Sequence, residues 1–465
     1  MRNMSINIKT TIRLQSVLLA LFVLCATSFA QPLLVNFAHI ERLTERIYLS
    51  GDSVNIVHVY ADFPSYQWTD AGNEGIACVD DAARAAVVYL RHFELTNSRR
   101  SLIKARELLK FVLKLQAEDG QFYNFMHADH SINRDGRTSF KSLGWWAARG
   151  VWCFGLGYRM FETEDPAFAA MLRSGIEKTF YHIDTLLRHY GETRMIARYS
   201  IPRWLLYESG SDASTELVLG LIEYYKATSN PQAKSYIEKL CDGMMKMQTG
   251  DARSYPFGLH RSWETMWHSW GNSQTFALAY AGKVLGDTDM VASAEREARG
   301  FYSRLLIDGM FKEWDCATPE KKIVYEQIAY GIRPLTLGLL RLYDATGNEI
   351  YQKMAGLAAS WFFGNNVLHE VMYDDVTGRC YDGITDSTSV NRNSGAESTI
   401  EALYTLIELE QYPMAMKYLR YKKINGSSTK QLIEGVFRNE SGDVLTLSLD
   451  LTDGNLTLHE GKHTR

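Results

Sequence analysis

Acidic side chains gather in one short segment near the start of the chain, Trp68–Arg84, which also holds small residues that let the backbone turn. Its four carboxylates are Asp70, Glu74, Asp80 and Asp81. Carboxyl groups of this kind can act as general acids, bases or nucleophiles. Asp80 and Asp81 also stand at the start of a strongly helical stretch, where a helix cap is the simpler explanation. The Gly- and Trp-rich surroundings favour a functional role.

A second set of polar residues lies near the other end of the chain, in Asn391–Glu401. Ser394 is followed three residues later by Glu397, the spacing of a capping box. Splitting a glycosidic bond needs two carboxyl groups: a neutral acid that protonates the leaving oxygen, and an ionised base or nucleophile. Glu397 and one of Asp80 and Asp81 could supply that pair if the fold brings the two segments together.

The elements that must position these groups follow a repeated pattern after Val79. Apolar residues recur at helical spacing, as in Ala82, Ala86, Tyr89 and Phe93. Two helices joined by a short turn recur about six times, and the turns fall near residues 96–98, 162–165, 228–230, 286–288, 344–347 and 410–413. Longer connections separate the pairs, at roughly 118–142, 190–211, 249–271, 307–324 and 363–393. Long loops of this kind are usually functional.

This alternation of short and long connections predicts the fold class. Helices within a pair are antiparallel, so all long connections fall at one end, together with the start of the first helix of each pair. We expect an all-α protein, an (α/α)6 toroid of six helical hairpins over residues 78–422 with a functional mouth and a plain back. An open helical solenoid has the same alternation and stands as the alternative. Residues 31–77 are expected to be irregular with a short strand near 54–60, and 423–465 to form a small β tail on the back of the ring.

Aromatic and polar side chains concentrate at the predicted mouth. Hydroxyl groups of a sugar need polar partners, and its apolar ring face stacks on Trp or Tyr, so this composition favours a carbohydrate substrate. We expect substrate contacts from Trp68, Glu74, Trp145, Trp146, Arg149, Asp212, Trp267, His268, Trp270, Gln274, Glu326, Tyr330, Arg333, Tyr381, Asp382, Asn391 and Arg392. Several have structural explanations: core packing for the paired tryptophans, a hydrogen-bonded interior histidine, and ion pairs for the two later arginines.

The chain resembles the six-hairpin glycosidases, the (α/α)6 group that includes family 9 endoglucanases, unsaturated glucuronyl hydrolases and family 8 and 15 enzymes. Trp68-Thr-Asp70-Ala-Gly-Asn73 is similar to the Asp-Ala-Gly-Asp segment of family 9, with Asn73 in place of the second Asp. Asn393-Ser-Gly-Ala-Glu397 is similar to that family's catalytic Glu region, with a different Asn–Glu spacing. Asp80-Asp81-Ala-Ala-Arg84 also resembles a segment of helical domains attached to some bacterial glycosyltransferases.

The leading hypothesis is therefore a glycoside hydrolase that cleaves a poly- or oligosaccharide. Glu397 is assigned as general acid and Asp80 or Asp81 as base. We expect inversion at the anomeric carbon if the carboxyls lie far apart.

Bulk properties limit the compartment and the partners. Residues 1–30 have a basic start, an apolar stretch and a small-x-small end at Ser28-Phe29-Ala30, as a secretory signal peptide does, which predicts a secreted or periplasmic protein. Removing them takes away three positive charges and no acids, so the formal net charge moves from −4 to −7. That acidity and the absence of a basic cluster argue against nucleic acid as a partner. We expect no membrane insertion after signal removal, and a monomer.

The cysteines do not predict a cofactor or a scaffold. Five remain beyond the signal peptide, far apart and mostly in apolar helical surroundings. Neither a zinc site nor a disulfide framework is indicated, and buried free thiols are expected. No cofactor is expected.

Two other function classes fit the same ring. A polysaccharide lyase or sugar epimerase would need groups that remove a proton beside a carboxylate or carbonyl, and His268, Tyr330, Arg333 and Arg392 are the candidates. A non-catalytic glycan-binding toroid would bind sugar without turnover.

Overall fold

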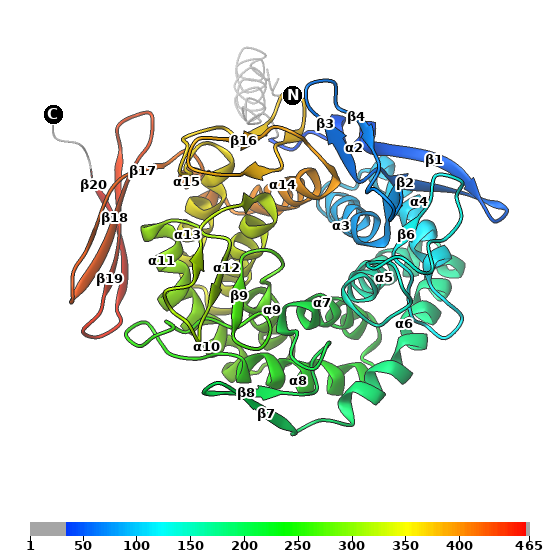
Figure 1. Cartoon of the computed structure of the whole chain (residues 1–465), viewed down its shortest axis with the longest axis horizontal. Helices are drawn as coiled ribbons and strands as arrows, with labels where there is room; N and C mark the ends of the chain where they lie inside the picture. The colour runs from blue at the N-terminus through cyan, green and yellow to red at the C-terminus, as the bar shows by residue number, and fades with distance from the viewer. Residues whose placement is uncertain (1–33, 462–465) are drawn as a thin grey trace, which may run out of the picture.

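The computed structural model describes residues 34–461. The signal peptide expected at residues 1–30 lies outside the described residues. Helices form six hairpins around a common axis, each with one inner and one outer arm (Figure 1). The inner arms are α3 (Val79–Thr96), α5 (Trp145–Glu164), α7 (Ser211–Thr228), α9 (Gln274–Leu285), α12 (Ile332–Thr346) and α14 (Ala396–Leu409).

The outer arms follow the inner ones after short turns. They are α4 (Arg99–Leu115), α6 (Pro166–Leu187), α8 (Pro231–Lys246), α10 (Thr288–Glu297) continued by a π turn (Ala298–Tyr302) and α11 (Ser303–Asp308), α13 (Glu349–Ala359) and α15 (Pro413–Tyr418). Local chemistry sets several boundaries. Asp165 and Asn230 cap α6 and α8 and precede a proline at the first helical position. Asn97 ends α3 in the left-handed conformation.

The inner helices close into a ring. Neighbouring contacts run α3–α5–α7–α9–α12–α14 and return from α14 to α3. This closure confirms the toroid and rules out the open solenoid. Two glycines let α5 and α7 approach closely: a Cβ on Gly155 would lie 2.2 Å from the carbonyl oxygen of Gly220. The first and last hairpins are neighbours, so the segments Trp68–Arg84 and Asn391–Glu401 come together, as the sequence predicted.

The long connections hold short strands that tie one loop to the next. One three-stranded sheet joins β9 (Met266–His268), β10 (Glu313–Asp315) and β11 (Lys322–Ile323). A second joins β12 (Gln327–Ile328), β15 (Gly383–Ile384) and β16 (Val390–Asn391). Two-stranded pairs join β5 (Ala77–Cys78) to β6 (Phe125–Met126), β7 (Thr193–Ile196) to β8 (Tyr199–Pro202), and β13 (Tyr373–Asp374) to β14 (Arg379–Cys380).

The segment before the ring is more ordered than the sequence predicted. It contains α2 (Ala38–Leu43), the hairpin β1 (Thr44–Leu49) and β2 (Asp52–Val57), and the hairpin β3 (Tyr60–Asp62) and β4 (Gln67–Thr69). Backbone N–H groups of Ser394 and Ala396 donate to the carbonyls of Ala61 and Val59, which docks this segment against the start of α14.

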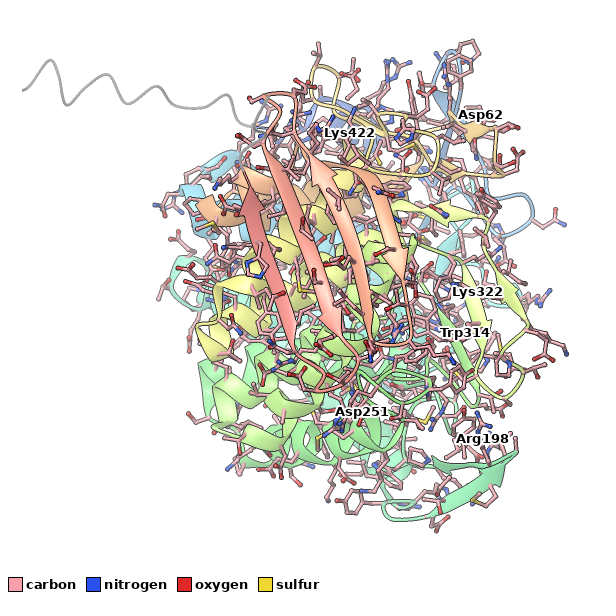
Figure 2. The ribbon with its side chains drawn as sticks, turned by 90° about the vertical axis from the view of Figure 1, so that its left-hand side faces the viewer. Asp62, Arg198, Asp251, Trp314, Lys322 and Lys422 are labelled. Carbon is pink, nitrogen blue, oxygen red and sulfur yellow. The ribbon has the colours of Figure 1, made fainter. Side chains whose placement is uncertain are left out.

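Beyond the ring the chain forms a four-stranded antiparallel sheet of β17 (Lys422–Ser428), β18 (Leu432–Arg438), β19 (Val444–Asp450) and β20 (Leu456–Gly461). The prediction that this tail packs on the back of the ring is wrong. The sheet stands at the outer circumference, where β18 and β19 contact α11 (Figures 1 and 2). Alternation along β18 and β19 buries Ile433, Phe437 and Leu447, which gives the sheet one apolar face to cover the outer helices.

The end of the ring opposite the mouth is not plain. A small cavity of about 200 Å³ lies there, lined by residues of the inner helices. Arg91 and Arg341 both pair with the buried Glu408, and Arg159 pairs with Glu223. Pairing with these arginines makes the burial of Glu408 and Glu223 tolerable. Among residues 34–461, no helix has both the length and the apolar character needed to cross a membrane.

Candidate active site

A cavity of about 550 Å³ opens at the end of the ring where the inner helices begin. Its lining comes from the start of α3, α5 and α14, from β3 and β12, and from the loops that precede β15 and follow β6. All three predicted catalytic residues line it: Asp80, Asp81 and Glu397. The ring thus brings together groups that lie more than 300 positions apart in sequence.

Asp80 stands on the α3 side of the cavity with its side chain 20% exposed. Its Oδ1 lies 2.6 Å from Nη1 of Arg149, which extends from α5. The side-chain amide of Asn124 donates to Asp80 Oδ2 at 3.2 Å, and its Oδ1 accepts from the backbone N–H of Asp80. Asp80 is thus held by a cation from α5 and by an amide from the residue that precedes β6.

Glu397 stands on the α14 side, and its side chain is 45% exposed. It shares one guanidinium with Asp81: Nη2 of Arg84 donates to Glu397 Oε2 at 3.2 Å and to Asp81 Oδ1 at 2.9 Å. The Glu397 and Asp81 oxygens that bond this nitrogen therefore lie no farther apart than the sum of the two hydrogen-bond lengths. Arg84 Nη1 donates to Glu401 at 2.7 Å, so a single buried cation serves three acids.

Burial and neighbouring negative charges raise the pKa of two carboxyl groups that line the cavity. Burial raises the pKa of Asp81 to about 6; Arg84 opposes the shift, while the charges of Glu397 and Asp80 add to it. Cys78 Sγ also donates to Asp81 Oδ2. Burial likewise raises the pKa of Asp382, against hydrogen bonds from Ser398 and the backbone of Gly395, and with help from the charges of Glu397 and Glu326.

Beneath the cavity lies a floor of paired ions around Arg333, which is fully buried. Its Nε donates to Glu401 Oε2 at 2.6 Å, and its Nη2 lies 3.4 Å from Glu216. Tyr330 lines the cavity just above and accepts a hydrogen bond from Nη2 of Arg149 at 2.5 Å. Burial raises the pKa of Tyr330, so its hydroxyl stays protonated. Glu401 of this floor pairs with Arg84, and Tyr330 accepts from Arg149, so both cavity arginines are held in place from below.

Five of the predicted substrate contacts line the cavity: Arg149, Glu326, Tyr330, Asp382 and Asn391. The second sheet positions the three from the later loops. Glu326 immediately precedes β12, Asp382 immediately precedes β15, and Asn391 ends β16.

Tyr381 and Arg392 line a neighbouring cavity of about 380 Å³ instead. Each is the chain neighbour of a residue that lines the main cavity, Asp382 or Asn391. The strands therefore form a wall between the two cavities, because successive side chains of an extended chain point to opposite sides.

A cluster on the α7 and α9 side is buried rather than presented to the cavity. His268 and Asp212 are both buried and joined by a hydrogen bond of 2.6 Å. Trp270 stacks on His268 with ring centroids 3.9 Å apart, and Trp267 packs among Phe301 and Phe311. Gln274 donates to Ser211. These residues, like Arg333, contact other protein groups and do not line the cavity.

The remaining predicted contacts also lie outside the cavity lining. Trp146 is buried and donates to the carbonyl of Phe122. Trp145 lies under the guanidinium of Arg149 at 5.1 Å. Glu74 accepts from the backbone of Thr138.

Trp68 stacks on His58 and donates to the carbonyl of Arg42. It pairs across the hairpin with the buried Ala61, so it faces away from Tyr60, which lines the cavity. Asp70 and Asn73, which carry the family 9 resemblance, are exposed and do not line the cavity.

Sequence reasoning missed several lining residues, among them Tyr60, Arg84, Asn124, Thr138 and Ser398. Arg84 had a usable signal, since it lies on the helix face of Asp80 and Asp81, one turn further on. Asn124 and Thr138 lie in a long loop whose path no periodic pattern reveals. Among residues 34–461, no three His, Cys, Asp or Glu side chains converge as metal ligands would. The five described cysteines are buried and free, as predicted.

Comparisons with known proteins bear on the fold. No protein-family model matches the sequence, and no curated protein matches it significantly. A cellobiose 2-epimerase from Bacillus thermoamylovorans B4167 aligns with a TM-score of 0.57 at 14% identity, covering 81% of this chain and 96% of that one. A sugar epimerase from a ruminal bacterium gives 0.54 at 15% identity, with 76% and 92% covered. A D-mannose isomerase gives 0.52 at 12% identity, with 76% and 91% covered. This chain has the (α/α)6-toroid fold of those structures.

Proposed function

We propose that this protein is a glycoside hydrolase acting on a poly- or oligosaccharide in the cavity at the mouth of the ring. The observation that carries the proposal is that half-exposed Glu397 lines the same cavity as Asp80 and Asp81, although it comes from a different helix of the ring. A sugar bound there would meet two carboxyl groups, which is what hydrolysis of a glycosidic bond requires. The similarity of fold to sugar-acting proteins supports a carbohydrate substrate.

In the proposed reaction Glu397 donates its proton to the leaving glycosidic oxygen. Asp80 is the better choice of base, because it is paired with Arg149 and is more exposed than Asp81. It would take a proton from water, whose oxygen bonds to the anomeric carbon as the C–O bond breaks. Asp81 is buried and shares Arg84 with Glu397, so it would act by holding the acid in place. Inversion of configuration stays a prediction.

The geometry does not favour the lyase alternative. Of its four candidate residues, only Tyr330 lines the cavity, and burial raises the pKa of that hydroxyl. His268 and Arg333 are fully buried, and Arg392 lies in the neighbouring cavity. A lyase also requires a uronate beside a cation that can neutralise it, and both lining arginines are already paired.

Epimerisation or isomerisation of a sugar is the second candidate, because the three compared structures with TM-scores above 0.5 carry such names. This reaction moves a C–H proton next to the carbonyl of an open-chain sugar. A cavity carboxylate would have to take that proton. In heavy water the product would then gain deuterium at carbon, whereas hydrolysis leaves every C–H bond intact.

The test is a glycan panel incubated with the purified protein and read three ways: new reducing ends, ultraviolet absorbance and proton NMR in heavy water. Hydrolysis predicts reducing ends alone. Glu397→Gln and Asp80→Asn should each lower turnover at least about a hundredfold, the usual contribution of a general acid or base. Glu118→Gln, an exposed carboxylate outside the cavity, should have no effect.

Each other outcome counts against the proposal. An unsaturated product indicates a lyase, and deuterium at carbon indicates an epimerase. Sugar binding without any product, unchanged in both variants, indicates a binding protein. Full turnover by Glu397→Gln would remove that residue from the mechanism.

A further inference from the structure

The main cavity holds more negative than positive charge. Among the described residues, five carboxyl groups line it, from Asp80, Asp81, Glu326, Asp382 and Glu397, against two cationic side chains. Even with one proton held at Asp81, the acids outnumber the cations. Fields in a partly enclosed cavity with protein walls are stronger than on an open surface. A substrate that enters this space therefore meets a negative potential.

Both cations are already engaged. Arg84 donates to Asp81, Glu397 and Glu401, and Arg149 contacts Asp80 at 2.6 Å and donates to Tyr330. Both side chains are buried and anchored to helices of the ring. Neither guanidinium can turn to meet a carboxylate or sulfate on a sugar without leaving its own acid unpaired, which is costly in a buried site.

Glu326 differs from the other four acids. Within residues 34–461 its side chain has no hydrogen-bond or ion-pair partner, although the other four each have at least one. It is partly buried, at the start of the sheet wall, and its charge acts on the neighbouring Asp382. A carboxylate held at a cavity wall without a partner is suited to accept hydrogen bonds from a ligand.

We infer that the cavity takes a sugar residue with a free amino group, and that Glu326 accepts the N–H bonds of that ammonium. This inference rests on the proposed function of the cavity and names its substrate class. An ammonium would offset the excess negative charge and supply three donors. A neutral sugar would bind more weakly through its hydroxyls, and a uronate or sulfated sugar would be excluded.

The test measures binding, so it does not depend on turnover. Dissociation constants would be measured by NMR titration for the amino, N-acetylamino, neutral and uronate forms of glucose, galactose and mannose. For whichever of the three sugars binds best, we expect the amino form to bind about tenfold more tightly than the neutral form, and the uronate form not to bind. Salt should weaken amino-sugar binding and leave neutral-sugar binding unchanged.

Two variants locate the effect. Glu326→Gln keeps the shape and a polar side chain, and should abolish most of the amino-over-neutral preference. Glu320→Gln removes an exposed carboxylate from the same loop and should leave the preference intact. Equal binding of amino and neutral sugars by the native protein would overturn the inference. So would a preference that survives Glu326→Gln.

Failure of the two proposals can be told apart. An amino-sugar preference without hydrolysis of any glycan would sink the hydrolase and leave the recognition of the amino group standing. Hydrolysis of neutral glycans alone, with no preference for amino sugars in binding, would overturn the recognition of the amino group and leave the hydrolase proposal standing.

Discussion

At the scale of single residues, Arg84 is the group on which the site depends. It is buried and contacts Asp81, Glu397 and Glu401. Replacing it by Met keeps much of the volume but leaves two buried carboxyls without this cation. We expect Arg84→Met to lower the free energy of unfolding at pH 7 by about 3–5 kcal/mol, as for other broken buried pairs. Urea unfolding measures this.

Arg99→Met is the matched control, because Arg99 pairs with Glu164 on the surface. Exposed pairs contribute at most about 1 kcal/mol. If the two substitutions lower the free energy of unfolding by the same amount, Arg84 is not the cation that stabilises these buried acids.

Asp81 gives a pH prediction whose sign follows from its raised pKa. The folded-state pKa of about 6 lies above the ordinary value of 3.8, so the folded protein binds this proton more tightly than the unfolded chain. The stability from that proton is present below pH 3.8 and is lost as pH rises to about 6, a total of about 3 kcal/mol. Asp81→Asn removes the titration.

The unfolding free energies of native protein and Asp81→Asn, measured from pH 4 to pH 7, check this prediction. The free energy of unfolding of Asp81→Asn should rise relative to that of the native protein as pH rises. This difference should level off above pH 6. A difference that does not change with pH would show that the carboxyl of Asp81 titrates alike in both states.

Sequence reasoning found the carboxyls of this site better than it found their partners. Asp80, Asp81 and Glu397 follow from a helix start and a motif, both local in the chain. The partnership of Arg84 with Glu397 spans 313 positions and depends on how the ring closes. Trp267 and His268 have the composition of a sugar platform, yet they are buried. Residue type alone does not separate a binding surface from a core.

At the scale of elements, the hairpin pattern predicted most helices to within a few residues, because 3.6-residue periodicity and capping are local properties. The exception is the segment before α12. The long connection predicted at 307–324 extends to residue 331 in the structure, because Gln327 and Ile328 form β12 and pair with Gly383 and Ile384. Pairing with a distant loop overrode the local preference.

The packing of α5 on α7 yields a prediction about a single methyl group. A Cβ at Gly155 would lie 2.2 Å from the backbone oxygen of Gly220, which cannot move without shifting α7. Gly155→Ala should therefore cost about 2 kcal/mol or more despite the better helix propensity of Ala. Thermal unfolding measures the loss.

Gly157→Ala, in the same helix, is its control. The nearest atoms to that new Cβ are methyl groups of Leu109 and Leu172, at 2.9 and 3.0 Å, and such side chains can turn aside. It should change stability by no more than about 1 kcal/mol. Equal losses in both variants would mean that the glycine contact does not set the helix spacing.

At the scale of the whole molecule, ring closure makes the two ends of the chain depend on each other. Helix α14 completes the ring between α12 and α3 and carries both Glu397 and Glu401. The four-stranded tail contacts the ring mainly at α11, on the circumference. Two truncations separate these roles: one ends at residue 421 and lacks the tail, and one ends at residue 395 and lacks α14 as well.

We expect the chain ending at 421 to unfold in one cooperative transition at a lower temperature, because it keeps the ring but exposes the part of α11 that the sheet covered. Its glycan turnover should persist. The chain ending at 395 should lose cooperative unfolding and aggregate, because the buried faces of α3 and α12 lose their partner and Arg84 loses two acids. Circular dichroism on heating and size-exclusion chromatography measure both. A stable, monomeric protein ending at 395 would mean that five hairpins suffice and that ring closure is not what holds the cavity together.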